Sequence, residues 1–345
     1  GRGSPPGGGP GRRFPRARQA ARAATVAAKP AVFVARVVNA VVLNRRFAAA
    51  ALRTAPDVVH AHDLNTLHPA TVVARRCGAR LVYDAHELAV HRNGMGPLRR
   101  AWARAHERSG LRAVDAMITT TDAWADYLAG VYRIPRPVVV RNVPEPLSVE
   151  RNDDLRTELD IRDDRRILLY QGSIQPNRGI EQIIDALALL PECVLVVVGY
   201  GAHRPVLERA VADRGLTDRV RFFGPVPNDL LLHYTAGVDV GMCCIRNSSL
   251  SYYWSLPNKL FEYMMAGVPC VASDFPEMGG IVRTEDVGEV CDPDDPASIA
   301  AAVARIVRDR DHASHCRANA RAATARHHWR LEEQQLLAAY DHLLH

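Results

Sequence analysis

The sequence lacks an apolar run of the roughly 18 residues that a membrane-spanning helix needs, so no segment is predicted to cross a bilayer. Its N-terminus lacks the apolar core and small-residue cleavage site of a secretory signal. Its seven cysteines show neither CxxC nor Cys/His spacing, which argues against a zinc site or a disulfide framework and for a reducing compartment. These absences together predict a cytoplasmic protein.

Acidic residues are missing from the beginning of the chain, where eleven arginines and lysines precede Asp57. This segment is far more basic than the net charge of +6 suggests. The stretch 31–52 mixes apolar and basic residues, and two interpretations stay open: a helix in peripheral contact with an anionic membrane, or a packed helix whose arginines reach the solvent. We favour the packed helix. Nucleic acid is not an expected partner, because no aromatic residues are interleaved with the basic ones and no recognition motif accompanies them.

Short β-rich runs alternate with helical stretches along the rest of the chain. Four come first: "DVVHAH", "RLVYDAH", "DAMITTT" and "PVVVRN". After a proline-containing linker, "VPEPLSVERND", six more follow: "RRILLYQGS", "CVLVVVGYG", "RVRFFG", "VDVGMCC", "PCVASD" and "GEVCDP". This alternation is typical of parallel sheets with crossover helices. The predicted fold class is therefore α/β, with two Rossmann-like doubly wound domains, the first one partial.

Domain boundaries follow from the same pattern and from the length of 345 residues, which fits about two domains. Residues 1–15 are rich in glycine and proline and are expected to be a flexible N-terminal segment. The partial first domain is expected at 16–145, the second domain at 146–326 and a C-terminal helix at 327–345.

One helix, within "SLPNKLFEYMMAGVPCVAS", combines core-building residues with two charged ones. Ser255 is predicted to cap it, Pro257 is tolerated in the first turn and Gly267 ends it. The apolar stripe is predicted to be buried and consists of Leu260, Phe261, Met264 and Met265. Lys259 and Glu262 are three residues apart and share another side, which we expect to face outward.

The start of this helix is a natural anion site, because its N–H groups are free and a lysine lies beside them. A carboxylate one turn further in would repel the anion, but it suits a pair of hydroxyls, since it accepts two hydrogen bonds at once. A nucleotide has both groups, because its phosphates are attached to a ribose that carries two neighbouring hydroxyls. The alternative is a solvated Lys259/Glu262 pair on a helix surface.

Several motifs resemble the donor half of the family-4 glycosyltransferases, which are retaining enzymes of the GT-B fold. They are "YQGSIQPNRGIEQIIDAL", "LVVVGYGAHRPVLERAVADRGLTDRVRFFGPVP", "AGVDVGM" and "PNKLFEYMMAGVPCVASDFPEM". "DVVHAHDLNTL" and "LVYDAHEL" resemble later strands of the acceptor half. The resemblance covers roughly residues 56–345 and implies two domains facing across a cleft. Such families begin with a strand and a glycine-rich loop, and no such segment precedes residue 56, so we expect an N-terminally incomplete chain.

By this resemblance, Glu262 matches the second glutamate of the E-x7-E signature, which binds the ribose hydroxyls of the donor. Trp254 occupies the position of the first glutamate, and the neighbouring "SYYWS" is a candidate to stack on the sugar instead. Lys259 and the N–H groups around Asn258 and Leu260 are expected to face the pyrophosphate.

The segment "GSIQPNRG" resembles the loop that places a basic pair on the diphosphate. Arg178 stands at the second basic position and Ser173 at the first, so Lys259 is expected to offset the missing cation. Gly172 is expected to let the backbone approach the donor closely.

His86 matches the histidine that faces the donor sugar across the cleft, and its implied role is to orient that sugar and stabilise charge at the anomeric centre. The leaving phosphate is then the base for the acceptor. Glu87, together with His60, His62 and Asp63, is expected to hold His86 or to bind the acceptor. No metal or other cofactor is expected, because the acidic "DPDD" at 292–295 reads as a turn after a strand.

The sequence therefore predicts a retaining, hexosyltransferase-like glycosyltransferase. Its donor is expected to be a UDP- or GDP-sugar, and its acceptor a glycan, a lipid or a small molecule. Two alternatives stay open. A sugar-nucleotide epimerase of the same fold would need no acceptor, and a non-catalytic nucleotide-binding scaffold would bind the donor without transfer.

Overall fold

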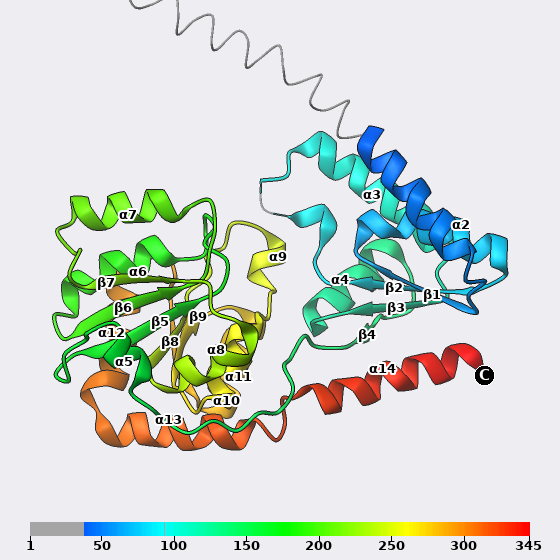
Figure 1. Cartoon of the computed structure of the whole chain (residues 1–345). Helices are drawn as coiled ribbons and strands as arrows, with labels where there is room; N and C mark the ends of the chain where they lie inside the picture. The colour runs from blue at the N-terminus through cyan, green and yellow to red at the C-terminus, as the bar shows by residue number, and fades with distance from the viewer. Residues whose placement is uncertain (1–37, 93) are drawn as a thin grey trace, which may run out of the picture.

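The computed structural model describes residues 38–92 and 94–345 and contains two parallel β-sheets (Figure 1). The first sheet has the order β1-β2-β3-β4, with β1 (Val58–His62), β2 (Arg80–Ala85), β3 (Ala116–Thr119) and β4 (Val138–Val139). The second has the order β10-β9-β8-β5-β6-β7, with β5 (Arg166–Gln171), β6 (Cys193–Val198), β7 (Val220–Gly224), β8 (Val240–Cys243), β9 (Cys270–Ser273) and β10 (Gly288–Cys291). The ten predicted strands and the α/β fold class are confirmed. The flexibility expected of residues 1–15 concerns a segment outside the described residues.

Helices connect the strands within each domain. The first domain contains α2 (Leu64–Cys77), η1 (Ala89–His91), α3 (Pro97–Leu111) and α4 (Asp122–Tyr132). The second contains α5 (Asp154–Glu158), α6 (Ile180–Ala186), η2 (Leu187–Leu189), α7 (Arg204–Asp213), α8 (Asn228–Ala236), α9 (Leu250–Tyr253), α10 (Asn258–Met265), α11 (Pro276–Glu285), α12 (Pro296–Arg308) and α13 (Arg310–Ala323). The chain ends in α14 (Trp329–Leu344).

The second sheet is buried on both faces, which explains why its strands are continuous apolar runs rather than alternating ones. Successive residues of a strand point to opposite faces. Accordingly, Ile167 and Leu169 of β5 belong to one apolar cluster, whereas Leu168 and Tyr170 belong to the other. The helices on the two faces complete these clusters.

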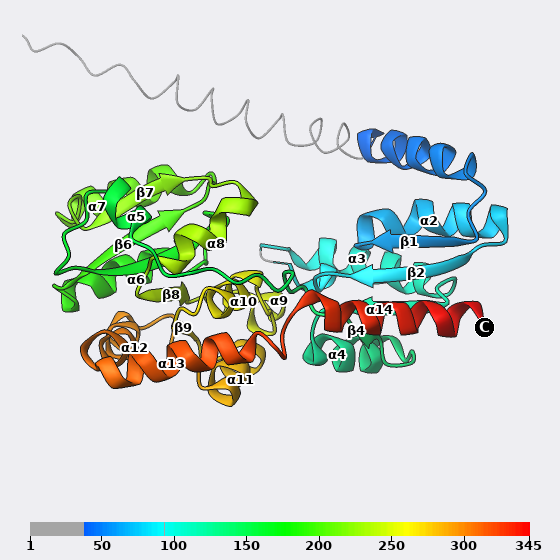
Figure 2. The ribbon, with the colours of Figure 1, turned by 60° about the horizontal axis from the view of Figure 1, so that its bottom comes forward.

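The chain crosses between the domains twice. The first crossing is residues 140–153, which contain the predicted linker at 143–153 and form neither helix nor strand. The last helix, α14, returns and lies against β4 of the first domain (Figures 1 and 2). The two crossings are joined where the Trp329 N–H donates to the Pro144 carbonyl at 3.0 Å and the Arg141 N–H donates to Glu332 at 2.8 Å. The C-terminal helix therefore belongs spatially to the first domain.

The basic stretch 31–52 is described only from residue 38, and residues 38–52 are helical. One side of this helix faces α2, and the two line a cavity with Val41, Leu52, His68 and Val72 in its walls. Five large apolar side chains stay exposed: Val38, Val41, Val42, Leu43 and Phe47. In the described part of the chain, no helix combines the length and apolar character that crossing a bilayer requires.

The helix over "NKLFEYMM" differs at its start from the prediction. It begins at Asn258 with Pro257 as N-cap, and the Ser255 hydroxyl donates to the Tyr252 carbonyl at 2.8 Å instead of capping. Pro257 has an extended backbone, and its side chain has no group that could accept a hydrogen bond from the first turn. The predicted end is confirmed, because Gly267 has a φ of 63° and its N–H donates to the Met264 carbonyl at 2.9 Å. The predicted apolar stripe is buried.

Candidate functional site

Lys259 and Glu262 of α10 do not face outward, which corrects the sequence prediction. The Lys259 side chain is buried, with 8% exposure, and its ammonium lies 3.8 Å from the centre of the Tyr170 ring. Glu262 accepts a hydrogen bond from Gln171, the last residue of β5. The side of the helix that the two residues share therefore faces the carboxyl end of the sheet. Burial raises the pKa of the Glu262 carboxyl, and the hydrogen bond from Gln171 opposes that rise.

Two cations, Lys259 and Arg178, gather at this strand end, and among the described residues neither forms an ion pair. The Lys259 ammonium and the Arg178 Nε are buried and have no hydrogen-bond partner in the described structure. The Arg178 guanidinium lies 4.8 Å from the centre of the Tyr252 ring. Burial raises the pKa of the nearby Cys243 thiol to about 11, and the charges of Lys259 and Arg178 both oppose that rise. An unpaired buried cation is costly, so this arrangement indicates an anionic ligand.

The N-terminus of α10 adds backbone donors to this place. The Leu260 N–H donates to the Pro257 carbonyl at 3.1 Å and is therefore occupied, and the Leu260 side chain is fully buried. The N–H groups of Asn258 and Lys259 find no acceptor among the described residues. Free N–H groups at a helix start bind anions. The N–H groups of Asn258 and Lys259 are therefore the two predicted backbone donors that are available to an anion.

Gly172 and Gly199 follow neighbouring strands and bring two loops together. Gly172 has a φ of 119° and Gly199 one of 141°, both in the region that favours glycine. A Cβ on Gly199 would lie 2.0 Å from the Gly172 carbonyl oxygen. A Cβ on Gly172 would meet nothing within 4 Å, so this backbone borders open space. The geometry fits the predicted close approach of a ligand to Gly172.

Replacing Gly199 with alanine is expected to lower the free energy of unfolding by roughly 2–4 kcal/mol, because the methyl group overlaps the Gly172 backbone and the positive φ is strained. Thermal denaturation measures this loss. Gly215→Ala is the matched control, since Gly215 has a φ of 66° but open space around its Cβ position, and should cost only about 1–2 kcal/mol. Equal losses for the two variants would contradict the close contact of the loops.

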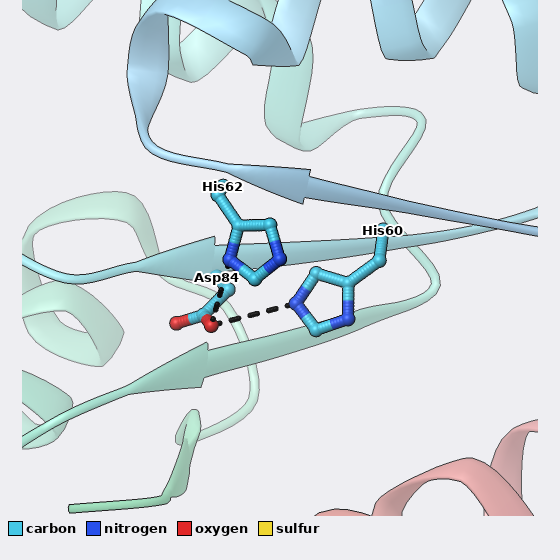
Figure 3. Close-up of side chains that lie close together, drawn as sticks. All are labelled: His60, His62 and Asp84. Carbon is cyan, nitrogen blue, oxygen red and sulfur yellow. Dashed lines mark ion pairs between the residues drawn. The ribbon is translucent and has the colours of Figure 1, made fainter. Parts of the chain in front are cut away.

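A second group of polar residues lies at the carboxyl end of the first sheet. His62 is paired in register with Asp84, so residues two apart on the two strands share one face. His86 Nε2 lies 3.0 Å from Asp84 Oδ2 and 3.1 Å from His62 Nδ1. His60 stacks on His62 with ring centres 4.3 Å apart, and its Nδ1 lies 2.6 Å from the Tyr340 hydroxyl of α14. Figure 3 shows His60 and His62 both pointing toward Asp84.

Asp84 dominates the electrostatics of this group. Burial alone would raise the pKa of its carboxyl, but the His60 imidazole beside it and the hydrogen bond from His86 hold that pKa well below its usual range. The hydrogen bond to Asp84 raises the pKa of His86, whereas burial and the charge of His60 lower that of His62. Asp84 is thus ionised and holds the ring of His86.

Three residues predicted to hold His86 or to bind the acceptor have different surroundings. His62 contacts His86 directly, whereas Glu87 forms an ion pair with Arg92 at 2.7 Å. Asp63 does not cap α2 with its side chain, and it has a φ of 62° while its N–H donates to the Asp84 carbonyl at 2.8 Å. Such strained backbone often marks a functional site. The residue that holds His86, Asp84, was missed, although the Asp-x-His spacing on a strand places both side chains on one face.

The two groups are brought toward each other by contacts between the domains. The Trp254 ring lies 5.5 Å from that of Tyr127 in α4, and Trp254 packs against the core of the first domain. Glu277 lies in the first turn of α11 and accepts a 2.8 Å hydrogen bond from the Ala123 N–H at the start of α4. Helix η1, just after His86, contacts α9, just before α10.

Comparisons with known proteins agree with this architecture. The model of the glycosyl transferases group 1 family matches residues 151–323, and that of the glycosyl transferase 4-like domain matches residues 3–143. D-inositol 3-phosphate glycosyltransferase of Xylanimonas cellulosilytica is 26% identical over 303 residues, which are 82% of this chain and 71% of that protein. Alpha-D-kanosaminyltransferase of Streptomyces kanamyceticus is 28% identical over 219 residues, 60% of this chain and 54% of that protein. The chain thus spans between half and three quarters of these two relatives.

Solved structures share the fold. Sucrose-phosphate synthase from Thermosynechococcus elongatus superposes with a TM-score of 0.76 at 23% identity, over 88% of this chain and 77% of that one. HepE of Anabaena, solved in complex with UDP, superposes with a TM-score of 0.74 at 18% identity, over 85% and 81%. At these identities the likeness is one of fold.

Proposed function

Because this chain belongs to the glycosyl transferases group 1 family, whose model matches residues 151–323, we propose that it transfers a sugar from a nucleotide-activated donor to an acceptor. Its two Rossmann-like domains have the GT-B fold. The donor site is the carboxyl end of the second sheet, and the acceptor side is the first domain.

The observation that carries this proposal is the buried Lys259 ammonium, which has no hydrogen-bond partner among the described residues. Arg178 and the N–H groups of Asn258 and Lys259 surround the same strand end, and together they suit a diphosphate. The raised pKa of Glu262 reflects a carboxyl that lacks solvent, so ribose hydroxyls would supply the hydrogen bonds that water does not. Uridine nucleotides are the first to test, because HepE was solved with UDP and with UDP-glucose.

The chemistry needs little from the protein beyond placement and charge. When the bond from the anomeric carbon to the diphosphate breaks, negative charge grows on the leaving phosphate, and Lys259 and Arg178 stabilise it. These two cations stabilise the charge that a metal ion stabilises in metal-dependent transferases, so no catalytic metal is required. The leaving phosphate accepts the proton of the acceptor hydroxyl on the same face of the sugar, which gives retention. His86, held by Asp84, orients the sugar.

Thermal denaturation with UDP-, GDP- and dTDP-sugars tests the donor, since a ligand that binds the native state raises the melting temperature. One nucleotide series should raise it, and the nucleoside diphosphate should act like the sugar nucleotide. A panel without effect would contradict the proposal. Inositol 3-phosphate is a first acceptor to test, because relatives carry that substrate in their names.

Glu262→Gln is expected to raise the Michaelis constant for the donor at least tenfold, because a hydrogen bond to a charged group is worth about 1.5–3 kcal/mol and the amide keeps the shape without the charge. Initial rates at varied donor concentration measure this constant. Glu208→Gln, at an exposed position on α7, is the control and should leave it unchanged. An unchanged constant in Glu262→Gln would reject the ribose assignment.

A further inference from the structure

The His60, His62 and Asp84 side chains converge on one point at the end of the first sheet (Figure 3). His60 Nε2 lies 3.4 Å and His62 Nδ1 lies 3.3 Å from Asp84 Oδ2. One ligand atom from each residue lies within 4.8 Å of the other two. The three residues stand on adjacent strands of a parallel sheet, so their positions are fixed by the ladder rather than by a loop.

Hydrogen bonding alone does not explain this convergence. Imidazole nitrogens of His60, His62 and His86 all face the same carboxylate oxygen, Asp84 Oδ2. The other oxygen, Asp84 Oδ1, is buried and has no hydrogen-bond partner in the part of the chain that the structure describes, and the same holds for His60 Nε2. A network built only from hydrogen bonds would be expected to use both oxygens, because buried polar atoms are nearly always satisfied.

We propose that His60, His62 and Asp84 bind a divalent transition-metal ion, Zn²⁺ being the best match. Zinc takes His and Asp ligands at about 2.0–2.2 Å in tetrahedral geometry, which puts neighbouring ligand atoms about 3.3–3.5 Å apart. The separations of 3.3 and 3.4 Å in the cluster agree with that spacing. The Tyr340 hydroxyl lies 2.6 Å from His60 Nδ1 and fixes that ring from the outer side, as second-shell partners of metal-bound histidines do.

The proposed ion is a regulator and not part of the transfer chemistry. Two imidazoles among three ligands favour Zn²⁺ over the hard cation Mg²⁺. Bound zinc would occupy Asp84 Oδ2, the atom that lies 3.0 Å from His86 Nε2. His86 stays beside the site, and 40% of its side chain is exposed. Zinc is therefore expected to inhibit glycosyl transfer. This consequence rests on the proposed function, whereas metal binding does not.

Isothermal titration of the chelator-treated full chain with Zn²⁺ tests the site. The Cys77→Ser background removes the cysteine that is not buried. One Zn²⁺ per chain is expected, with no measurable binding of Mg²⁺. His62→Gln changes a side chain that is 61% exposed and should fold normally, and it should weaken Zn²⁺ binding at least tenfold, as should His60→Gln. His342→Gln, an exposed histidine of α14, should bind like the parent.

Equal Zn²⁺ affinity in the parent and in both cluster variants would overturn the proposal, and so would equal affinity for Mg²⁺. Titration of the same samples with the nucleoside diphosphate separates the two hypotheses. Nucleotide binding without zinc binding would reject only the metal site. Zinc binding without nucleotide binding would support the metal site and reject the proposed function.

Discussion

Replacing Lys259 with methionine is expected to weaken the binding of the nucleoside diphosphate about 100-fold. A hydrogen bond to a charged group is worth about 1.5–3 kcal/mol, and two such bonds from a buried ammonium to the phosphates reach the roughly 2.7 kcal/mol that a 100-fold change requires. Methionine is unbranched and similar in length, so it keeps the contact with the Tyr170 ring. Isothermal titration with the diphosphate and with the matching nucleoside measures the effect.

The nucleoside is the control for this substitution, because it lacks the phosphates and should bind Lys259→Met as it binds the parent. Arg209→Met, at an exposed position of α7, should change neither affinity. The ligand-free Lys259→Met chain should also melt at a higher temperature, since the substitution removes a buried cation that has no hydrogen-bond partner among residues 38–92 and 94–345. Equal losses for nucleoside and diphosphate would contradict the role of Lys259.

Replacing His86 with alanine is expected to lower kcat about 1000-fold while changing the donor Kd less than threefold. Electrostatic stabilisation by one positioned group at a reacting centre contributes a factor of about 10² to 10³ in kcat. Donor affinity should be nearly unaffected, because Lys259, Arg178 and Glu262 belong to the other domain. Initial rates at saturating donor and titration of the donor separate the two quantities.

Asp84→Asn tests whether the carboxylate acts through His86. The amide keeps the volume but loses the charge that holds the imidazole, so kcat should fall and the donor Kd should not. In the His86→Ala background the same substitution should have little further effect, because residues acting as a unit are not additive. His68→Ala, on α2 away from the cluster, serves as the control. A fully active His86→Ala enzyme would contradict the assignment.

The strands and their order along the chain could be predicted because each is a short apolar run between turn residues. β5 and β6 illustrate this, since both faces of the second sheet are covered and no alternation interrupts the runs. The end of α10 was also predictable from Gly267. The chain contains only two lysines, Lys29 and Lys259, among its 44 basic residues, and this scarcity was a signal that Lys259 is special.

The burial of Lys259 and Glu262 could not be read from the sequence. Helical spacing shows that the two residues share a side, but what lies opposite is Gln171 at the end of β5, which is distant along the chain. The contacts of Glu277 with Ala123 and of Trp254 with Tyr127 depend on how the two domains meet, and local patterns carry no information on that.

The most direct test of glycosyl transfer is a ¹H NMR time course of the chain with the sugar nucleotide that it binds and an acceptor panel. Nucleoside diphosphate should appear together with a new anomeric signal of the same configuration as the donor. Conversion of the sugar nucleotide into its epimer without an acceptor would contradict transfer, and so would a donor that binds but stays unchanged with every acceptor.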